Sequence, residues 1–448
     1  MFSGVFLWLN RGRGDIEQVA RDDMNPTSIE SHLVLVLVEW VVILLLARVF
    51  GRLALALGQP LAVGEITAGL LLGPSVLGAV WPDAMQFLFP DTTQKSLQIL
   101  AKVGLILLLF QVGMEFDYGH LRTRSRTVGL VSLMGLLAPA GAGLLIGPWL
   151  HRTFSPELPF LGFQIFVCIA LTISALPIMG RILIEMGLEH TPLGAMAISS
   201  AAIDDVVGWV FLAAGTALVQ SGFSPGRLVL QVGGLVGLFL LLQRVVGPLL
   251  RRIWRAGQEE GQSPVLHKGF LAVLLAGLFL SCVAASILGV FSLFGAFLFG
   301  VALHQERDLV RVWRERFSDF VLVALVPIFF TNTGLRTEIG ALTTPLAWWG
   351  ALVVMVAAVG GKLGGCYLGA RLSGQPGREA FGIAALMNTR ALMGLVAINV
   401  AMELGLLTPV LFTMFVLMAL VTTAMTVPLL RRSLCTATRS ESAVGRHS

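Results

Sequence analysis

The chain has 448 residues, of which 56% are hydrophobic and only 13% are charged, and its mean hydropathy is +0.84. A soluble protein carries about twice that charged fraction, so the composition excludes an ordinary soluble enzyme and indicates an integral membrane protein with many spans. The formal net charge of +5 does not indicate nucleic-acid binding, because the distribution of Lys and Arg between the loops is the informative quantity in a membrane protein.

Thirteen apolar runs are expected to cross the membrane, since a spanning helix needs about 20 apolar residues. In chain order they lie at 32–55, 60–80, 97–116, 128–150, 158–186, 191–219, 228–250, 267–288, 290–304, 317–334, 344–370, 379–402 and 408–430. The second and ninth runs are short or interrupted by Gly and Pro, and the boundary between the eighth and ninth is the least distinct. The predicted fold class is therefore an all-α polytopic membrane protein.

The segments that flank the spans carry little hydrophobic pattern. Residues 1–31 are expected to form a disordered N-terminal extension, residues 32–430 one transmembrane domain, and residues 431–448 a short basic tail. The first ten residues are too short for a signal peptide with a cleavage site, and Met24 is an alternative start. No Gly-rich nucleotide-binding motif follows a predicted strand, so neither an appended regulatory domain nor a cofactor is expected.

The basic residues indicate the orientation. If the N-terminus lies outside, most Lys and Arg residues fall in the inward loops and the tail, as the positive-inside rule requires. Among them are Arg122, Arg124, Arg126, Arg251, Arg252, Arg255, Arg307, Arg311, Arg314, Arg316, Arg431 and Arg432. We therefore expect a multi-pass protein of the plasma or inner membrane with an outer N-terminus and a cytoplasmic C-terminus.

Two adjacent carboxylates, Asp204 and Asp205, interrupt the apolar run SSAAIDDVVGWVFLAAG. Each costs about 2.5–3.5 kcal/mol near the bilayer centre, so the pair indicates a functional site. Neighbours on a helix are about 100° apart and can both face one cavity. The alternative is a polar pair that holds helices together, but a single Asn or Ser does this at lower cost.

Two basic residues, Lys362 and Arg390, also lie within apolar runs. Lys362 is flanked by glycines, which allow another backbone to come close. A buried lysine requires a counter-charge, and Asp204 or Asp205 is the obvious candidate for either basic residue. The alternative for Lys362 is that its side chain extends to the cytoplasmic face.

The fifth and twelfth runs look broken at mid-membrane. The polar or helix-breaking residues are Thr172, Ser174 and Pro177 in the fifth, and Asn388, Thr389 and Arg390 in the twelfth. Broken helices that meet at the midplane build the ion sites of secondary transporters. Because the two runs are seven spans apart, they have opposite orientations, as an inverted repeat requires. A simple proline kink is the alternative for the fifth run.

Six motifs in order resemble the monovalent cation:proton antiporter-2 family, which includes Kef-type and plant cation/proton exchangers. They are QPLAVGEITAGLLLGPSVLG, LLLFQVGMEFDYGHLR, TISALPIMGRILIE, AAIDDVVGW, PIFFTNTGLRTEI and NTRALMGLV, which together cover about residues 32–430. The resemblance implies an inverted-repeat fold with two crossed unwound helices, a mobile core and a panel that forms a homodimer.

The resemblance also assigns roles. Asp205 matches the aspartate that carries the proton and transiently binds the transported Na⁺ or K⁺, and Lys362 matches the lysine that pairs with the preceding acid, here Asp204. Thr172 and Ser174 match the first unwound stretch, and residues 388–390 match the second. Where many relatives have NTRGLMEL, this chain has Ala391 and Gly394. The Kef-type regulatory tail is also absent from the sequence.

The expected function is secondary active exchange of a monovalent cation for protons by alternating access, rather than enzymatic catalysis. The acidic pair favours Na⁺ and electrogenic exchange, because two acids and one lysine let more than one proton move per cation. The alternatives are K⁺/H⁺ antiport or Kef-like potassium efflux. Remote alternatives are a non-transporting sensor and an intramembrane aspartyl protease, which needs its aspartates on two helices.

Overall fold

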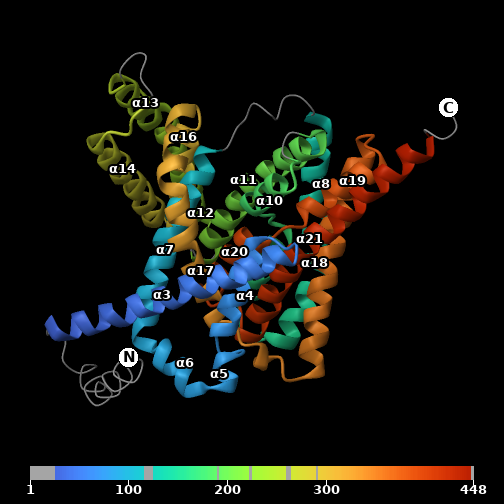
Figure 1. The fold of residues 1–448 in the computed structure, drawn as a ribbon, viewed down its shortest axis with the longest axis horizontal. Helices are drawn as coiled ribbons and strands as arrows, with labels where there is room; N and C mark the ends of the chain where they lie inside the picture. Colours follow the sequence, from blue (N-terminus) through green and yellow to red (C-terminus); the bar gives the residue numbers. More distant parts are fainter. Residues whose placement is uncertain are drawn as a thin grey trace.

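The computed structural model describes residues 26–115, 125–188, 191–220, 225–258, 264–288 and 291–444, and its regular elements are all helices. Figure 1 shows them gathered around a central set of crossed segments. The α-helices are α3 (Pro26–Ala56), α4 (Leu61–Leu72), α5 (Leu77–Val80), α6 (Pro82–Leu88), α7 (Asp91–Met114), α8 (Ser125–Phe154), α9 (Phe160–Thr172), α10 (Leu176–Glu185), α11 (Pro192–Gln220), α12 (Pro225–Leu241), α13 (Gly247–Ala256), α14 (Lys268–Ile287), α15 (Ser292–Leu303), α16 (Arg307–Trp313), α17 (Val326–Leu335), α18 (Pro345–Leu372), α19 (Gly377–Met387), α20 (Ala391–Glu403) and α21 (Pro409–Val444).

Each of the thirteen predicted runs overlaps at least one described helix. Within the described residues, nine helices are long and apolar enough to cross a membrane, or up to eleven if each of two bent pairs forms one span. The helices α9 and α15 are apolar but shorter. The all-helical fold is as predicted, and the number of thirteen spans stays a prediction.

Two boundaries differ from the sequence prediction. The first helix already begins at Pro26, so residues 26–31 belong to α3, and the rest of the predicted extension lies outside the described residues. The last helix runs on to Val444, so most of the predicted tail is helical. No Gly or Pro occurs between Pro428 and Gly445, and nothing in that segment breaks a helix.

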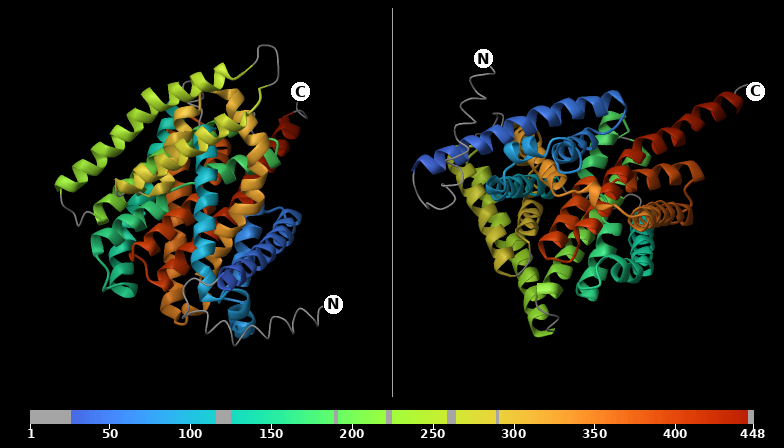
Figure 2. Two further views of the ribbon diagram at one scale, coloured as in Figure 1. Left: turned by 90° about the vertical axis from the view of Figure 1, so that its left-hand side faces the viewer. Right: turned by 90° about the horizontal axis from the view of Figure 1, so that it is seen from below.

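The helices pack in two groups, which we call the core and the panel. In the core, α8 packs along α18 and α9, and α19 packs against α18 and α21. In the panel, α15 packs against α7 and α14, and α17 packs against α4 and α7. Figure 2 shows α12 and α14 along one outer side of the molecule.

Close packing in the core depends on a row of glycines on α18. A Cβ atom on Gly361, Gly365 or Gly369 would lie 2.7, 2.3 or 2.4 Å from backbone atoms of α8. These glycines therefore allow the two backbones to touch, as small residues do between membrane helices. Because Lys362 follows Gly361 directly, the row also fixes the depth at which this lysine enters the core.

The two ends of the helical bundle differ in charge. We call the end that holds Arg255, Arg307 and Arg314 the Arg-rich face, and the opposite end, where α20 stops, the Glu403 face. In Figure 1 the Arg-rich face lies at the top, near α13 and α16, and α5 and α6 lie at the bottom. Ion pairs join neighbouring segments: Arg314 to Glu115 and Arg255 to Glu306 on the Arg-rich face, and Lys102, midway along α7, to Glu403 at the end of α20.

Candidate ion-binding site

The two predicted breaks cross in direct contact at the centre of the core. The helix α9 stops at Thr172 and α10 starts at Leu176, whereas α19 stops at Met387 and α20 starts at Ala391. The backbone N–H of Ala175 donates to the Thr389 carbonyl at 2.8 Å, and the Ser174 hydroxyl donates to the Met387 carbonyl at 3.0 Å. Non-helical backbone is tolerated at membrane depth where it is buried in protein in this way.

Pro177 is the second residue of α10, where the lack of a backbone donor does no harm. The fifth run is therefore a complete break and not a proline kink in one continuous helix. The second pair, α19 and α20, is bent by 42° at its break.

Asp204 and Lys362 form an ion pair with no exposed side-chain surface. Lys362 Nζ lies 2.5 Å from Asp204 Oδ2 and also donates to the carbonyls of Thr172 at 2.7 Å and Gly135 at 3.0 Å. The Ser174 hydroxyl shares its one proton between the Met387 carbonyl and the same carboxylate oxygen, which lies 3.2 Å away. All three ammonium protons thus have acceptors. Lys362 does not extend to the Arg-rich face, so the alternative prediction, that its side chain reaches the cytoplasmic face, does not describe the structure.

Asp205, unlike its neighbour Asp204, forms no ion pair with a described residue. Its side chain is 2% exposed, and neither carboxylate oxygen has a hydrogen-bond partner among the described residues. The backbone N–H of Leu176, at the start of α10, lies near the carboxylate without normal hydrogen-bond geometry. A buried carboxylate in this state is strongly unfavourable unless a proton or a cation neutralises it.

A small cavity opens beside Asp205. It is lined by Ile173, Gly208, Leu212 and Met393, and a water molecule can centre itself in about 10 Å³ of it. That is about the space that one water needs. The cavity therefore admits a proton carrier or a dehydrated cation but not a fully hydrated one.

Arg390 does not form the expected direct pair with a carboxylate. Its guanidinium donates to the carbonyls of Leu171 and Ala170, at the end of α9, and to the carbonyl of Ala358 at 2.8 Å. It follows α19 at the break and so faces the free carbonyls at the end of α9, where a helix carries partial negative charge. Arg390 therefore stabilises the first break, and it acts on Asp204 only from a distance.

The remaining predicted residues contact backbone carbonyls or another hydroxyl. The Thr172 hydroxyl donates to the Cys168 carbonyl at 2.6 Å, so its own carbonyl, not its hydroxyl, contacts Lys362. Asn388 Nδ2 lies 3.5 Å from the Thr422 carbonyl, and the hydroxyls of Thr389 and Thr426 are 3.1 Å apart.

Sequence reasoning missed the threonines of α21 that support the second break. Thr423 Oγ1 accepts from the N–H groups of Arg390 at 3.3 Å and Ala391 at 3.0 Å, and so takes the place of an N-cap residue for α20. The signal was present in ALVTTAMTVPL, where Thr422, Thr423 and Thr426 interrupt the thirteenth apolar run.

Replacing Thr423 by Val is expected to lower the melting temperature in detergent, since two buried N–H groups lose their acceptor. The loss of a cap costs about 1–2 kcal/mol, and Thr423→Ser should restore most of it. Thr422→Val is the matched control, because the Thr422 hydroxyl bonds only to carbonyls of its own helix. Equal melting temperatures for Thr423→Val and Thr422→Val would contradict the capping role.

Comparisons with known proteins agree with this geometry. Residues 41–432 match the family model "Sodium/hydrogen exchanger, transmembrane". Over 400 residues the chain is 35% identical to the Na⁺/H⁺ antiporter NhaS4 of Synechocystis, and the match covers 89% of this chain and 96% of that protein.

Longer relatives match as well. Cation/H⁺ antiporter 20 of Arabidopsis thaliana is 32% identical, and K⁺/H⁺ antiporter 1 of Saccharomyces cerevisiae is 28% identical. The matches cover 88% and 83% of this chain but only 48% and 43% of those proteins, so the chain spans about half their length. Among solved structures, the sodium proton antiporter MjNhaP1 of Methanocaldococcus jannaschii superimposes with a TM-score of 0.62 at 16% identity, covering 89% of this chain and 96% of the other.

Proposed function

The chain belongs to the sodium/hydrogen exchanger transmembrane family, and we propose that it exchanges a monovalent cation for protons at Asp205. The family consists of transporters, and the helical fold with two crossed breaks suits such exchange. The observation that carries the proposal is the contrast between two neighbouring acids. Asp204 is neutralised by Lys362, whereas Asp205 lies at a cavity with no partner of its own.

Competition for one carboxylate couples the two ions. Burial and a like-charged neighbour penalise an ionised carboxylate, and a nearby ammonium favours it. Only a site occupied by a proton or a cation is neutral enough to change its exposure cheaply, because an empty buried charge is expensive. The protein therefore exchanges ions and does not leak them.

We propose Na⁺ as the preferred cation and K⁺ as the alternative. The most similar of the relatives described above is named a Na⁺/H⁺ antiporter, and the yeast relative is named a K⁺/H⁺ antiporter. The protease alternative has no support in the geometry, because both aspartates lie on α11 and one is bound to Lys362.

Purified protein in liposomes, challenged with Na⁺, K⁺ or Li⁺ while a lumenal dye reports pH, tests the proposal. We expect Na⁺ to drive alkalinisation or acidification according to its gradient. Because Asp204, Asp205 and Lys362 together let more than one proton move per cation, the rate should also respond to a membrane potential. Each net charge moved gains about 2.3 kcal/mol per 100 mV.

The results of this assay distinguish electrogenic from electroneutral exchange, and an antiporter from a protein that does not exchange these cations. Rates that do not change with potentials clamped by valinomycin would show electroneutral exchange. Because valinomycin carries K⁺, this part of the assay uses Na⁺ as the driving ion. A protein that moves protons with none of the three cations would not be an antiporter.

We further propose an outer N-terminus, a cytoplasmic Arg-rich face, a location in the cell membrane, and a homodimer formed through the panel. The basic residues gathered on one face support the orientation. Large apolar side chains on α12 and α14, such as Leu230 and Ile287, are 73% and 80% exposed and need lipid or a second copy to cover them. We propose residues 32–430 as the transmembrane domain. Its first and last helices, α3 and α21, run beyond these bounds at both ends, from Pro26 and to Val444.

A further inference from the structure

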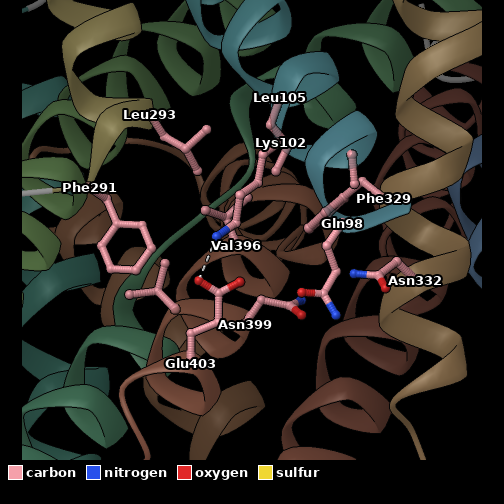
Figure 3. A pocket seen from close by; sticks show the side chains of 12 residues that line it. Gln98, Lys102, Leu105, Phe291, Leu293, Phe329, Asn332, Val396, Asn399 and Glu403 are labelled. Atoms are coloured by element: carbon pink, nitrogen blue, oxygen red, sulfur yellow. Dashed lines mark hydrogen bonds and ion pairs between the residues drawn. The ribbon is translucent and has the colours of Figure 1, made fainter. Parts of the chain in front are cut away.

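The ion pair on the Glu403 face joins the two groups of helices. Lys102 lies on α7 of the panel, and Glu403 ends α20, which packs against α21 and α9 of the core. Lys102 Nζ and Glu403 Oε2 are 2.9 Å apart. In Figure 3 the Lys102 side chain reaches across to the Glu403 carboxylate. The two side chains are 46% and 26% exposed, and both line the mouth of a cavity.

A cavity lies behind this pair. Its polar lining includes Gln98, Asn332 and Asn399, and Phe291, Phe329 and Val396 belong to its apolar wall. About 30 Å³ of it can hold the centre of a water molecule, which is room for about two waters.

The amide of Asn399 is held in one orientation. Its Nδ2 donates to the Thr333 hydroxyl at 3.0 Å and to the Leu395 carbonyl at 2.9 Å. No described residue donates to its Oδ1. The cavity thus has a carboxylate at its mouth and an amide oxygen behind it, and oxygen atoms of this kind attract cations.

The same face of α20 continues from this cavity to Asp205. Val396, Asn399 and Glu403 follow one another at spacings of three and four residues, which is one face of a helix. Met393, one turn before Val396, lines the smaller cavity beside Asp205. The two cavities therefore lie in series along α20, between the Glu403 face and the proposed carrier acid.

We propose that these cavities are the closed form of the route between Asp205 and the Glu403 face, and that the Lys102 ammonium is its gate. Lys102 acts as a tethered cation: it occupies the carboxylate that draws in a transported cation when the core and the panel move apart. This proposal rests on the proposed exchange at Asp205.

The exposure of the pair suits a gate that opens in every cycle. Partly exposed ion pairs bind weakly, so the pair biases the closed state only several-fold and separates readily. Separating a fully buried pair, such as Asp204 with Lys362, costs far more, because each charge is then left in the protein interior without compensation.

Lys102→Gln tests the gate in oriented proteoliposomes. With Na⁺ added on the Glu403 face, the half-saturating concentration should fall about two- to fivefold, the bias that an exposed ion pair supplies. With Na⁺ on the Arg-rich face the half-saturating concentration should stay constant or rise. A larger population of the state open to the Glu403 face leaves a smaller population open to the Arg-rich face. Glu403→Gln breaks the same ion pair but also removes the attracting carboxylate, so on the Glu403 face it should lower the half-saturating concentration less than Lys102→Gln does. Arg311→Gln, which breaks an exposed pair with Asp308 on the opposite face, is the matched control.

A second readout does not depend on transport. Val396→Cys places a thiol in the cavity wall, and a membrane-impermeant maleimide applied at the Glu403 face labels it, with the label located at residue 396 by peptide mass spectrometry. Labelling should be faster when Lys102→Gln is added. An unchanged labelling rate, or an equal change in affinity from both faces, overturns the gate. Faster labelling in a protein that does not exchange cations for protons supports the gate and overturns the proposed function.

Discussion

Asp205→Asn is expected to reduce cation-driven proton movement to the background of empty liposomes while the protein stays folded. Asparagine has nearly the same shape but neither binds the exchanged proton nor supplies a charge for the cation. Because no described residue forms a hydrogen bond with the Asp205 carboxylate, which is 2% exposed, removing its charge also removes an unfavourable burial. The melting temperature of the variant in detergent should therefore be equal to or higher than that of the unmodified protein.

The control for this variant is Asp308→Asn, which removes an exposed acid on the Arg-rich face that pairs with Arg311. It should transport at the unmodified rate. If Asp205→Asn exchanged as fast as Asp308→Asn, Asp205 would not be the carrier, and the partnerless carboxylate would need another explanation.

Lys362→Met and Asp204→Asn are each expected to destabilise the protein by about 3–5 kcal/mol, since each leaves one charged partner buried without compensation. The double variant should recover part of that loss, because neither charge is then stranded. Unfolding in detergent, followed for all four proteins of a double-mutant cycle, gives the coupling energy. The conservative replacements keep the side-chain volumes, so cavity formation contributes little.

The exposed pair Arg311–Asp308 provides the comparison for this cycle. Its coupling should be at most about 1 kcal/mol, as for other solvent-exposed ion pairs. Strictly additive losses for Lys362→Met and Asp204→Asn would show that the buried pair is not coupled, and electrogenic exchange would then lose its structural basis.

The parts of the site that sequence alone predicted share one physical cause. A charge such as Asp205 or Lys362, or a break such as the one at Ser174, is costly within an apolar span, so each stood out from its surroundings. The pattern of apolar runs also placed the helices, because a span requires a minimum length in lipid. Polar residues within an apolar span can therefore be recognised from the sequence alone, without knowing which helices are neighbours.

The remaining features depend on which helices adjoin. The charge pattern alone left open which acid Lys362 contacts, and only the family resemblance assigned it to Asp204. Arg390 was assigned to a carboxylate, whereas it donates to the carbonyls that end α9. Thr423 reads locally as one more small residue, and its role follows from the position of the second break beside α21. Lys102 and Glu403 lie 301 positions apart, so no local pattern relates them.

The glycine row on α18 has a consequence for the variation that this lineage can tolerate. A side chain at Gly365 would meet the α8 backbone at 2.3 Å, so the helices would have to separate. Lys362, on the same helix, would then be drawn away from the Gly135 carbonyl on α8. The glycines of α18 bind no ion, but their substitution would disturb the ion site, so they come under the same selection as the site itself. Mutational drift should be slow along this seam and free on the lipid-facing side of α18, where Val356 is 62% exposed.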